Sequence, residues 1–375
     1  MKVAIFTDTY LPQVNGVSQT IKRMTQYYRT KNIPYIIISP ECFVDEAQPS
    51  NVSFLSVPLL IYPECRITFP NMFRLNRILH AFKPTLIQCM TEFNLGLCGL
   101  WYAKKYNIPS VSNYSTNFDQ YLNYYHLKSM NGPLWSYLRW FHNQHALTLC
   151  PSNVTKQYLL DNGVQDISIF TRGVDLKQFS PTFRDSNLRK ELGISDKIAL
   201  LYVGRLAPEK NLDVLRQSFE ALLQQFKERI VLIVTGDGPL MNEMVATFPK
   251  ETIFTGYKTG ADLSKLYASC DLFVFPSQTE TLGNVVLEAN ASGLPVVGVN
   301  AGGVANLITN QLNGYLAKPN DIESFTNCVK KLITNDVLRF SMSMQGVEFA
   351  KRQDWTQILD ELVTLQYQVS KNVLA

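Results

Sequence analysis

The segment that most constrains the fold runs from Ser277 to Glu288, with the sequence SQTETLGNVVLE. A short apolar run at 271–275 precedes it, and apolar residues at helical spacing follow it as far as Gly293. A buried strand that leads through a polar loop into a helix is typical of a parallel α/β sheet. Because a helix start exposes unpaired N–H groups and partial positive charge, the backbone at Gly283 and Asn284 is expected to attract an anion.

Two carboxylates flank this predicted anion site, Glu280 before the helix and Glu288 about two turns inside it. Carboxylates do not bind phosphate, but they accept hydrogen bonds from sugar hydroxyls. The combination therefore indicates a ligand that carries both phosphate and sugar, such as a nucleotide sugar, rather than a bare phosphate.

A second loop of the same kind, GRLAPEKN at 204–211, follows the apolar run 198–203 and precedes a predicted helix at 212–226. Arg205 can hold phosphate oxygens with its planar fork of donors, and Lys210 can act as a point charge. Two cations beside an anion-binding helix start could together neutralise a leaving diphosphate.

Strand-like and helical runs alternate along the whole chain, which predicts parallel sheets in an α/β fold. The expected strands are 2–6, 35–39, 52–57, 86–90, 110–112, 147–149, 167–170, 198–203, 231–235, 253–254, 272–275 and 296–299. A chain of 375 residues is too long for one ordinary core, so two domains are expected. We place their boundary between about Gly173 and Asn187, where the sequence becomes polar and basic.

The charge is unevenly distributed and only mildly basic. Residues 1–175 carry 15 Lys and Arg against 10 Asp and Glu, whereas 176–375 carry 20 against 21. This excess is too small for a nucleic-acid-binding protein, but it suits contact with an anionic lipid surface or an acidic acceptor. The segment 66–82 mixes arginines with apolar residues and is predicted to be an amphipathic helix. Its apolar face could pack on the sheet, or the helix could lie on a membrane.

The cysteines and histidines do not predict a metal site. Seven cysteines, an odd number, are widely spaced and form no Cys-x-x-Cys pair, which favours reduced thiols in a cytoplasmic protein. His142 and His145 are spaced for one helix face, where packing is commoner than metal binding. The N-terminus is strand-like rather than a signal peptide, and no apolar run approaches the roughly 18 residues of a membrane span.

Two loops of the first half could also contribute to a site. Gly16 precedes a predicted helix and would allow close approach to a ligand, although a plain turn glycine is equally consistent with the sequence. The loop lacks the Gly-x-Gly-x-x-Gly fingerprint, which argues against a nicotinamide or flavin enzyme. The segment 114–125, YSTNFDQYLNYY, follows a strand, so its polar and aromatic side chains could line an acceptor groove or form core beneath a loop.

Several of these motifs together resemble the retaining glycosyltransferases of family GT4. Glu280 and Glu288 are separated by seven residues. A predicted strand that ends in Pro-Ser precedes them, and the sequence Glu-Ala-x-Ala-x-Gly-x-Pro-Val-Val begins at Glu288. Gly-Arg-x-x-x-x-Lys, Gly-x-Gly-Pro and Gly-Val-Asp…Phe-x-Pro are also similar to motifs of that family, so the resemblance covers essentially the whole chain. It implies a GT-B fold, in which two Rossmann-like domains face each other across a cleft. Residues 1–175 would bind the acceptor, residues 176–353 the nucleotide sugar, and a last helix at 355–370 would cross back onto the first domain.

The resemblance also implies a reaction, transfer of a hexose from a UDP- or GDP-linked donor to a hydroxyl with retention of the anomeric configuration. Arg205 and Lys210 would hold and stabilise the leaving diphosphate, helped by the N–H groups of Leu282, Gly283 and Asn284. No Asp-x-Asp motif is found, so neither a metal nor a cofactor is expected.

Four further roles are implied by the same resemblance. Glu280 would orient the donor hexose, and Glu288 would accept hydrogen bonds from the ribose hydroxyls. Gly16 would lie near the diphosphate, and Tyr257 would lie near the nucleotide base.

The acceptor is expected to be a lipid or a cell-envelope glycan, reached by a protein that contacts an anionic membrane at most peripherally. Relatives carry a His beside the transferred sugar where this chain has Ser115, so its role is lost, altered or taken by a neighbour such as Asn117 or Asp119. Tyr121 is expected in the same vicinity. Two alternatives remain. One is a nucleotide-sugar epimerase, for which the sequence lacks the extra acid and base groups. The other is a catalytically silent scaffold, which is supported only by Ser115.

Overall fold

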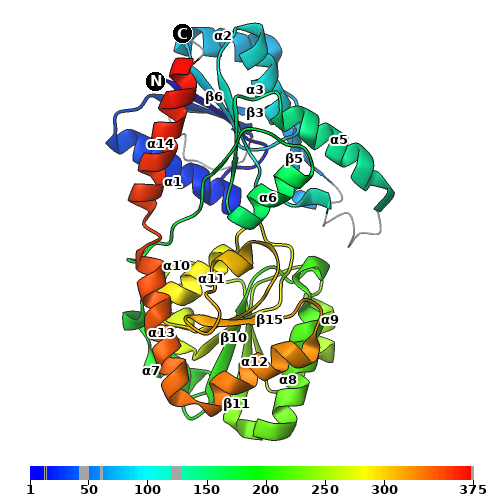
Figure 1. The fold of residues 1–375 in the computed structure, drawn as a ribbon, viewed down its shortest axis with the longest axis vertical. Coiled ribbons are helices and arrows are strands. Elements are labelled where there is room, and N and C mark those ends of the chain that lie inside the picture. The colour runs from blue at the N-terminus through cyan, green and yellow to red at the C-terminus, as the bar shows by residue number, and fades with distance from the viewer. Residues whose placement is uncertain (12, 14, 42–49, 60–61, 120–127, 373–375) are drawn as a thin grey trace. The chain divides into compact units, whose positions relative to one another are not determined.

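The computed structural model describes residues 1–11, 13, 15–41, 50–59, 62–119 and 128–372. They form two compact units (Figure 1). The first unit comprises the described residues of Met1–Thr116, Ser129–Thr171 and Trp355–Ala375, and the second comprises those of Asn117–Lys128 and Arg172–Asp354. Residues 117–119, which lie inside the predicted domain 1–175, thus group with the second unit.

The first unit is built from alternating strands and helices. Its described elements are β1 (Val3–Phe6), α1 (Gly16–Thr30), β2 (Tyr35–Pro40), β3 (Asn51–Phe54), β4 (Ser56–Leu59), β5 (Tyr62–Thr68), α2 (Met72–Phe82), β6 (Leu86–Cys89), α3 (Asn94–Lys105), β7 (Ser110–Asn113), α5 (Asn131–His142), β8 (Leu147–Cys150), α6 (Asn153–Asp161), β9 (Ile167–Ile169) and α14 (Trp355–Asn372), with a short 3-10 turn at Lys128–Met130. Seven of these strands form one parallel sheet in the order β3-β2-β1-β6-β7-β8-β9.

Alternate residues of β1 point into two separate cores, because successive side chains of a strand face opposite sides of a sheet. Val3 and Ile5 pack with α1 and α14, which lie side by side. Ala4 and Phe6 pack with α2 and α3 on the other face. Both faces of the sheet are covered, which explains why its central strands are apolar throughout.

The predicted helix at 66–82 is wrong in its first part. Residues up to Thr68 belong to strand β5, which pairs antiparallel with β4, and α2 begins only at Met72, where Asn71 caps it through Arg74 N–H. The predicted strand 52–57 also divides at Leu55, because only its first half joins the parallel sheet. The apolar side of α2, including Leu79, is buried against the sheet, as one of the two interpretations required.

A chain of buried polar side chains ties α14 into the first unit. The Tyr28 hydroxyl donates to Gln366 Oε1 at 2.8 Å, and Gln366 Nε2 donates to Gln88 Oε1 at 2.9 Å. Gln88 Nε2 in turn donates to Asn113 Oδ1 at 2.5 Å, at the carboxyl end of β7. All four side chains are almost completely buried, so each depends on the next for its hydrogen bonds.

The second unit repeats the α/β pattern. Its elements are α7 (Ser186–Glu191), β10 (Ile198–Val203), α8 (Leu212–Phe226), β11 (Ile230–Thr235), α9 (Met241–Thr247), β12 (Thr252–Gly256), α10 (Gly260–Ser269), β13 (Leu272–Phe275), α11 (Asn284–Ala291), β14 (Val296–Val299), β15 (Gly314–Ala317), α12 (Ile322–Thr334) and α13 (Asp336–Lys351), with 3-10 turns at Pro181–Phe183, Pro208–Lys210, Lys227–Arg229 and Gly302–Asn306.

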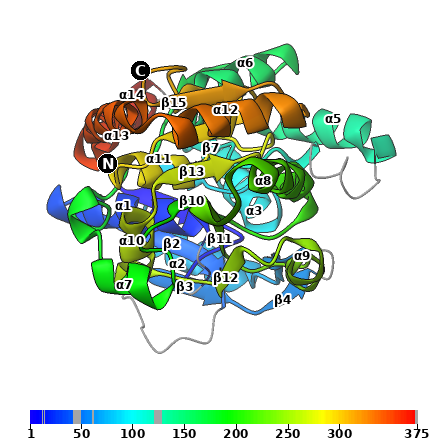
Figure 2. The same cartoon turned by 90° about the horizontal axis from the view of Figure 1, so that it is seen from below.

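The six strands of this unit form a parallel sheet in the order β12-β11-β10-β13-β14-β15. The helices α8 and α12 pack against each other, and both views show them side by side (Figure 1 and Figure 2). Helix α7 packs with α10, and α11 packs with α13. The order reverses at β10, so the loops after β10 and β13 leave the sheet next to each other, as at the switch point of an open α/β sheet.

A buried arginine fixes the entry to this sheet. Arg189 of α7 donates to the carbonyls of Ile194, Ser195, Lys197 and Ser269 and to the carboxylate of Asp271. The planar guanidinium can satisfy so many acceptors because it carries five N–H groups in fixed directions. Its pattern in the sequence, a basic residue in a polar linker, gave no sign of this role.

The cysteines with described side chains, Cys89, Cys98, Cys150, Cys270 and Cys328, are free thiols. His142 and His145 are buried and bond to Ser112 and Ser110, so both side chains pack in the core of the first unit. No helix of the described residues combines the length and apolar character that crossing a bilayer would require.

Candidate active site

The loops after β10 and β13 meet in an ion pair. Lys210 Nζ lies 2.5 Å from Glu280 Oε1, and the same carboxylate oxygen accepts from the Ser277 hydroxyl at 2.8 Å. The Thr279 hydroxyl also donates to the carbonyl of Glu209 at 3.2 Å. The two predicted site loops are therefore connected by side-chain and backbone contacts within the second unit.

This pair is charged at neutral pH. Burial by itself favours the neutral forms, but the attraction between the partners is stronger: the pKa of Lys210 is raised and that of Glu280 is lowered. The side chains of Lys210 and Glu280 are only 12% and 18% exposed, so solvent screens their attraction little.

The start of α11 is open to an anion. Gly283 precedes the helix in the left-handed region, with φ of +93°, a conformation that a side chain would disfavour. Among the described residues, no acceptor is hydrogen-bonded to the backbone N–H groups of Leu282, Gly283 or Asn284. Three neighbouring unpaired donors at a helix N-terminus are what an anion requires.

The loop that carries Glu280 is supported from behind by a glycine. The N–H of Gly303 donates to the carbonyl of Glu280 at 2.6 Å, and a Cβ on Gly303 would lie only 2.2 Å from the Thr281 oxygen. Only glycine allows the two backbones to lie so close. Residues 301–304 thus position the Glu280 loop, a role that their glycines alone did not reveal in the sequence.

Arg205 lies in the same β10 loop as Lys210. The Tyr202 hydroxyl of β10 donates to its carbonyl at 3.0 Å, and the N–H of Leu206 donates to the carbonyl of Asp237 at 2.9 Å. The backbone around Arg205 is therefore held by both its own strand and the turn after β11. Its side chain is half-buried.

Glu288 lies in α11, as predicted, although it is about one turn rather than two from the helix start at Asn284. One of its carboxylate oxygens is already engaged. The Tyr267 hydroxyl donates to Glu288 Oε2 at 3.0 Å. Burial raises the pKa of this carboxyl to about 7, against the effect of that hydrogen bond. Glu288 can therefore gain or lose a proton near neutral pH, whereas Glu280 cannot.

The structure also reveals a carboxylate that the sequence did not single out. Glu209 precedes Lys210 and is completely buried, and neither of its carboxylate oxygens has a hydrogen-bond partner among the described residues. It contributes to raising the pKa of Lys210. Only its position beside a predicted cation could have indicated its importance, because burial of a charged residue is rare and leaves no pattern in the sequence.

The predicted acceptor segment divides between the two units. Asn117 groups with the second unit, where its Nδ2 donates to the carbonyl of Thr279 at 3.1 Å. Its Oδ1 is buried and has no hydrogen-bond partner among the described residues. Asp119 is also buried in this unit, whereas Ser115 belongs to the first. Tyr121 lies outside the described residues.

Gly16 and Tyr257, both predicted to contact the nucleotide sugar, belong to different units. Gly16 is the exposed first residue of α1 in the first unit, where Asn15 caps the helix by accepting from Val17 and Ser18 N–H groups. Tyr257 follows β12 in the second unit and is 58% exposed.

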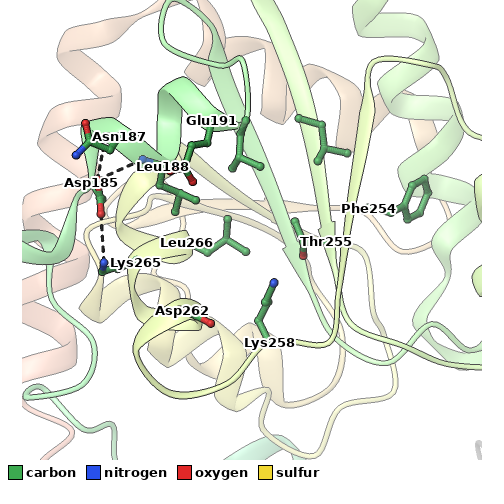
Figure 3. A pocket seen from close by; sticks show the side chains of 12 residues that line it. Asp185, Asn187, Leu188, Glu191, Phe254, Thr255, Lys258, Asp262, Lys265 and Leu266 are labelled. Carbon is green, nitrogen blue, oxygen red and sulfur yellow. Dashed lines mark hydrogen bonds and ion pairs between the residues drawn. The ribbon is translucent and has the colours of Figure 1, made fainter.

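A groove of about 450 Å³ lies beside β12, bounded by α7 and α10 (Figure 3). Thr255 and Lys258 line it, but Tyr257 does not, and neither do the residues of the Lys210–Glu280 pair. Asp185 and Lys265 form an ion pair at one end, with 3.3 Å between their charged atoms. The groove is thus separate from the anion-binding helix start. No cluster of three or more potential metal ligands occurs in the described part of the chain.

Comparison with known proteins identifies the family. Residues 184–349 match the family model "Glycosyl transferases group 1", and residues 14–178 match "Glycosyltransferase Family 4". The chain is 30% identical over 372 residues to the "GDP-mannose-dependent alpha-mannosyltransferase" of Corynebacterium glutamicum, covering 97% of this chain and 88% of that protein. It is 29% identical over 331 residues to the "Alpha-monoglucosyldiacylglycerol synthase" of Streptococcus pneumoniae, covering 84% and 75%.

The fold has solved counterparts. The structure of Anabaena Alr3699/HepE in complex with UDP and glucose matches with a TM-score of 0.77, covering 98% of this chain and 100% of that one at 20% identity. The two parallel sheets with helices on both faces confirm the predicted GT-B architecture. With both halves of the chain matched by their models, the protein belongs to the family 4, group 1 glycosyltransferases and is an enzyme of that class.

Proposed function

We propose that this glycosyltransferase moves a hexose from a nucleoside-diphosphate sugar to a hydroxyl, with retention of the anomeric configuration. The observation that carries the proposal is the Lys210–Glu280 ion pair, 2.5 Å long, beside the unpaired N–H groups that open α11. It combines the cation and backbone donors that a diphosphate needs with a carboxylate that a sugar hydroxyl can reach.

The leaving diphosphate is bound by Arg205 and Lys210 and by the N–H groups of Leu282, Gly283 and Asn284. Charge develops on the diphosphate as the glycosidic bond breaks, so donors already fixed in place stabilise the transition state more than the ground state. These groups supply the positive charge that a metal provides in other transferases, and we therefore propose metal-independent turnover.

The sugar and ribose are held by the carboxylates. Glu280 orients the hexose, because its second oxygen is not engaged by Lys210 or Ser277. Glu288 accepts from the ribose hydroxyls with its ionised form. Tyr257 contacts the base, and Gly16 of the first unit approaches the diphosphate.

Asn117 takes over part of the role that a His has in relatives at the position of Ser115. Its buried Oδ1 is available to accept a hydrogen bond from a sugar hydroxyl, and its Nδ2 holds the peptide that precedes Glu280. Asp119 lies two residues farther along and assists it. Neither side chain carries the positive charge of an imidazolium, so the diphosphate depends more strongly on Arg205 and Lys210.

The relatives suggest which donor and acceptor to test. One relative is named for GDP-mannose and another for a glucosylated diacylglycerol, and the Anabaena structure holds UDP. We propose GDP-mannose and UDP-glucose as the first donors, and diacylglycerol-type lipids or cell-envelope glycans as acceptors.

The first test is a thermal-shift series with UDP, GDP, ADP and their sugar conjugates, with and without EDTA. A ligand that binds only the folded state raises the melting temperature. A shift with one nucleotide, unchanged by EDTA and lost in Arg205→Ala, supports the proposed site. Absence of any shift contradicts it.

The second test measures turnover. Product formation from the bound donor, with the α or β configuration read by nuclear magnetic resonance, establishes both activity and retention. Arg205→Ala and Glu280→Gln are expected to abolish turnover, and full activity of either variant contradicts the role proposed for that residue.

A further inference from the structure

Glu209 is a buried acid of the β10 loop whose side chain makes no hydrogen bond that would explain it. It lies in the short 3-10 turn Pro208–Lys210, immediately before Lys210, and is completely buried. Neither of its carboxylate oxygens has a hydrogen-bond partner among the described residues. Its backbone is held independently of the side chain, since its carbonyl accepts from the Thr279 hydroxyl at 3.2 Å. The local fold therefore does not require a carboxylate at this position.

The carboxylate of Glu209 lies in the same charged cluster as Lys210 and Glu280. Tyr202 is the reference point, because its buried hydroxyl donates to the Arg205 carbonyl at 3.0 Å. Burial raises the pKa of this phenol, and the charges of Lys210, Glu280 and Glu209 all act on it. The pKa of Lys210, which burial lowers, is raised by Glu280 and also by Glu209. An acid that acts on both groups lies close to the cations of the proposed diphosphate site.

The charges of this cluster cancel before a nucleotide binds. Arg205 and Lys210 carry two positive charges, and Glu209 and Glu280 carry two negative ones. Asp237, whose carbonyl accepts from this loop, is exposed, so water and salt screen its charge. Glu280 has a task in the proposed function, because it orients the hexose. Glu209 is the additional negative charge, and it opposes the two cations that a diphosphate needs.

Keeping Glu209 buried destabilises the folded chain. A charge that is removed from water without a hydrogen-bond partner is unfavourable by several kcal/mol in typical cases. Groups of this kind persist at functional sites, where stability is given up for activity. The burial of Glu209 beside Lys210 therefore indicates a function in the site rather than a contribution to the fold.

We propose that Glu209 repels the bound diphosphate and thereby speeds the release of the nucleotide product. This role rests on the proposed function, because it requires the diphosphate to lie beside Arg205 and Lys210. Without an opposing charge, two fixed cations and the N–H groups at the start of α11 would hold the product as firmly as they hold the leaving group. With Glu209 in place, they stabilise the leaving group but do not retain it.

The repulsion acts more strongly on the product than on the donor. When the C–O bond to the sugar breaks, both electrons stay on the terminal phosphate and the acceptor oxygen bonds to the sugar carbon. The acceptor proton passes to that phosphate or to water. The freed phosphate can ionise a second time at about pH 6, so the nucleoside diphosphate carries more negative charge than the nucleotide sugar. A fixed negative charge therefore weakens product binding more than donor binding.

The test compares the wild type with Glu209→Gln and Glu209→Leu, which remove the charge and keep most of the side-chain volume. Titration calorimetry gives the affinities for GDP, GDP-mannose, UDP and UDP-glucose. Stopped-flow displacement of fluorescently labelled GDP or UDP gives the dissociation rate of the product. The matched control is Glu228→Gln, at an exposed glutamate just before β11 and therefore at the opposite edge of the sheet.

Both Glu209 variants are expected to bind the nucleoside diphosphate about tenfold more tightly and to release it correspondingly more slowly. Their gain in affinity for the nucleotide sugar is expected to be smaller. Both are expected to melt at or above the wild-type temperature, because a buried charge has been removed. Glu228→Gln should match the wild type in every measurement.

Three results overturn the role of Glu209. They are unchanged or weaker binding of the diphosphate, which a carboxylate that contacts the ligand would produce, equal gains for product and donor, and loss of the folded state in both variants. If the wild type binds none of the four nucleotides, the proposed function fails and the role of Glu209 fails with it. If the wild type binds a nucleotide and the variants bind it equally well, only the role of Glu209 fails.

Discussion

The partly buried Glu288 provides a quantitative test of the site. Its carboxyl has an ordinary pKa of 4.5, which burial raises to about 7 in the folded chain. A difference of roughly 2.5 units corresponds to about 3 kcal/mol, at about 1.4 kcal/mol per unit. The folded state binds the proton more tightly than the unfolded state, so protonation of Glu288 adds to the free energy of unfolding. This stabilising contribution is fully present below the ordinary pKa and is lost as the pH rises through about 7.

The variant Glu288→Gln keeps a neutral side chain at every pH and can still accept from the Tyr267 hydroxyl. We expect it to match the wild type near pH 4 and to be more stable by as much as about 3 kcal/mol near pH 9, with a melting temperature several degrees higher. The control substitution is Glu361→Gln, at an exposed glutamate of α14. It should leave the stability unchanged both near pH 4 and near pH 9.

The assay is thermal unfolding between about pH 4 and pH 9, followed by circular dichroism and by tryptophan fluorescence. All four tryptophans, at 101, 135, 140 and 355, lie in the first unit, so fluorescence monitors the unit that does not contain Glu288. Parallel profiles for the wild type and Glu288→Gln in circular dichroism would refute the reasoning. The same reasoning predicts that a nucleotide whose ribose bonds ionised Glu288 binds the wild type more tightly as the pH rises through about 7.

Three further predictions concern other contacts. Lys210→Ala leaves Glu280 buried without its cation and should destabilise the second unit by about 3 kcal/mol or more. The double variant Lys210→Ala/Glu280→Gln should recover much of that loss in urea unfolding. If the effects of the two substitutions are additive, the pair is not coupled. Gly303→Ala places a Cβ 2.2 Å from the Thr281 oxygen and should lower turnover by displacing the Glu280 loop. Ala301→Gly serves as the control. Full activity of Gly303→Ala would show that the loop tolerates the shift. Gln366→Leu leaves Tyr28 and Gln88 without their shared partner and should cost about 2 kcal/mol in the first unit, read from tryptophan fluorescence; an unchanged transition would show that water replaces the amide.

Much of the fold could be predicted from the sequence because its strands are buried on both faces and therefore apolar throughout. The run 198–203, for example, became β10 with the predicted bounds, and the helix predicted at 212–226 became α8. The hairpin of β4 and β5 could not be predicted in the same way. Prediction from periodicity assumes that apolar residues are buried, but those of this hairpin face water. The segment 66–68 was therefore predicted as helix although it forms the end of β5.

The site was predictable to the extent that it depends on chain order. Loops that follow neighbouring parallel strands meet at one edge of a sheet, so Lys210 and Glu280 could be expected together. The burial of Glu209, the support that Gly303 gives from behind and the contact of Asn117 with Thr279 depend on tertiary packing. None of these has a local signature.

The buried polar chain through Gln366 has a consequence for the synthesis of the protein. The core on one face of the first sheet includes Ile358, Leu359 and Leu362, so that face stays open until the ribosome has added residues 355–372. The second unit, formed by described residues of 117–128 and 172–354, contains none of these residues and emerges before them. The half of the chain made first is therefore completed last, and its exposed apolar face stays uncovered until residues 355–372 have been synthesised.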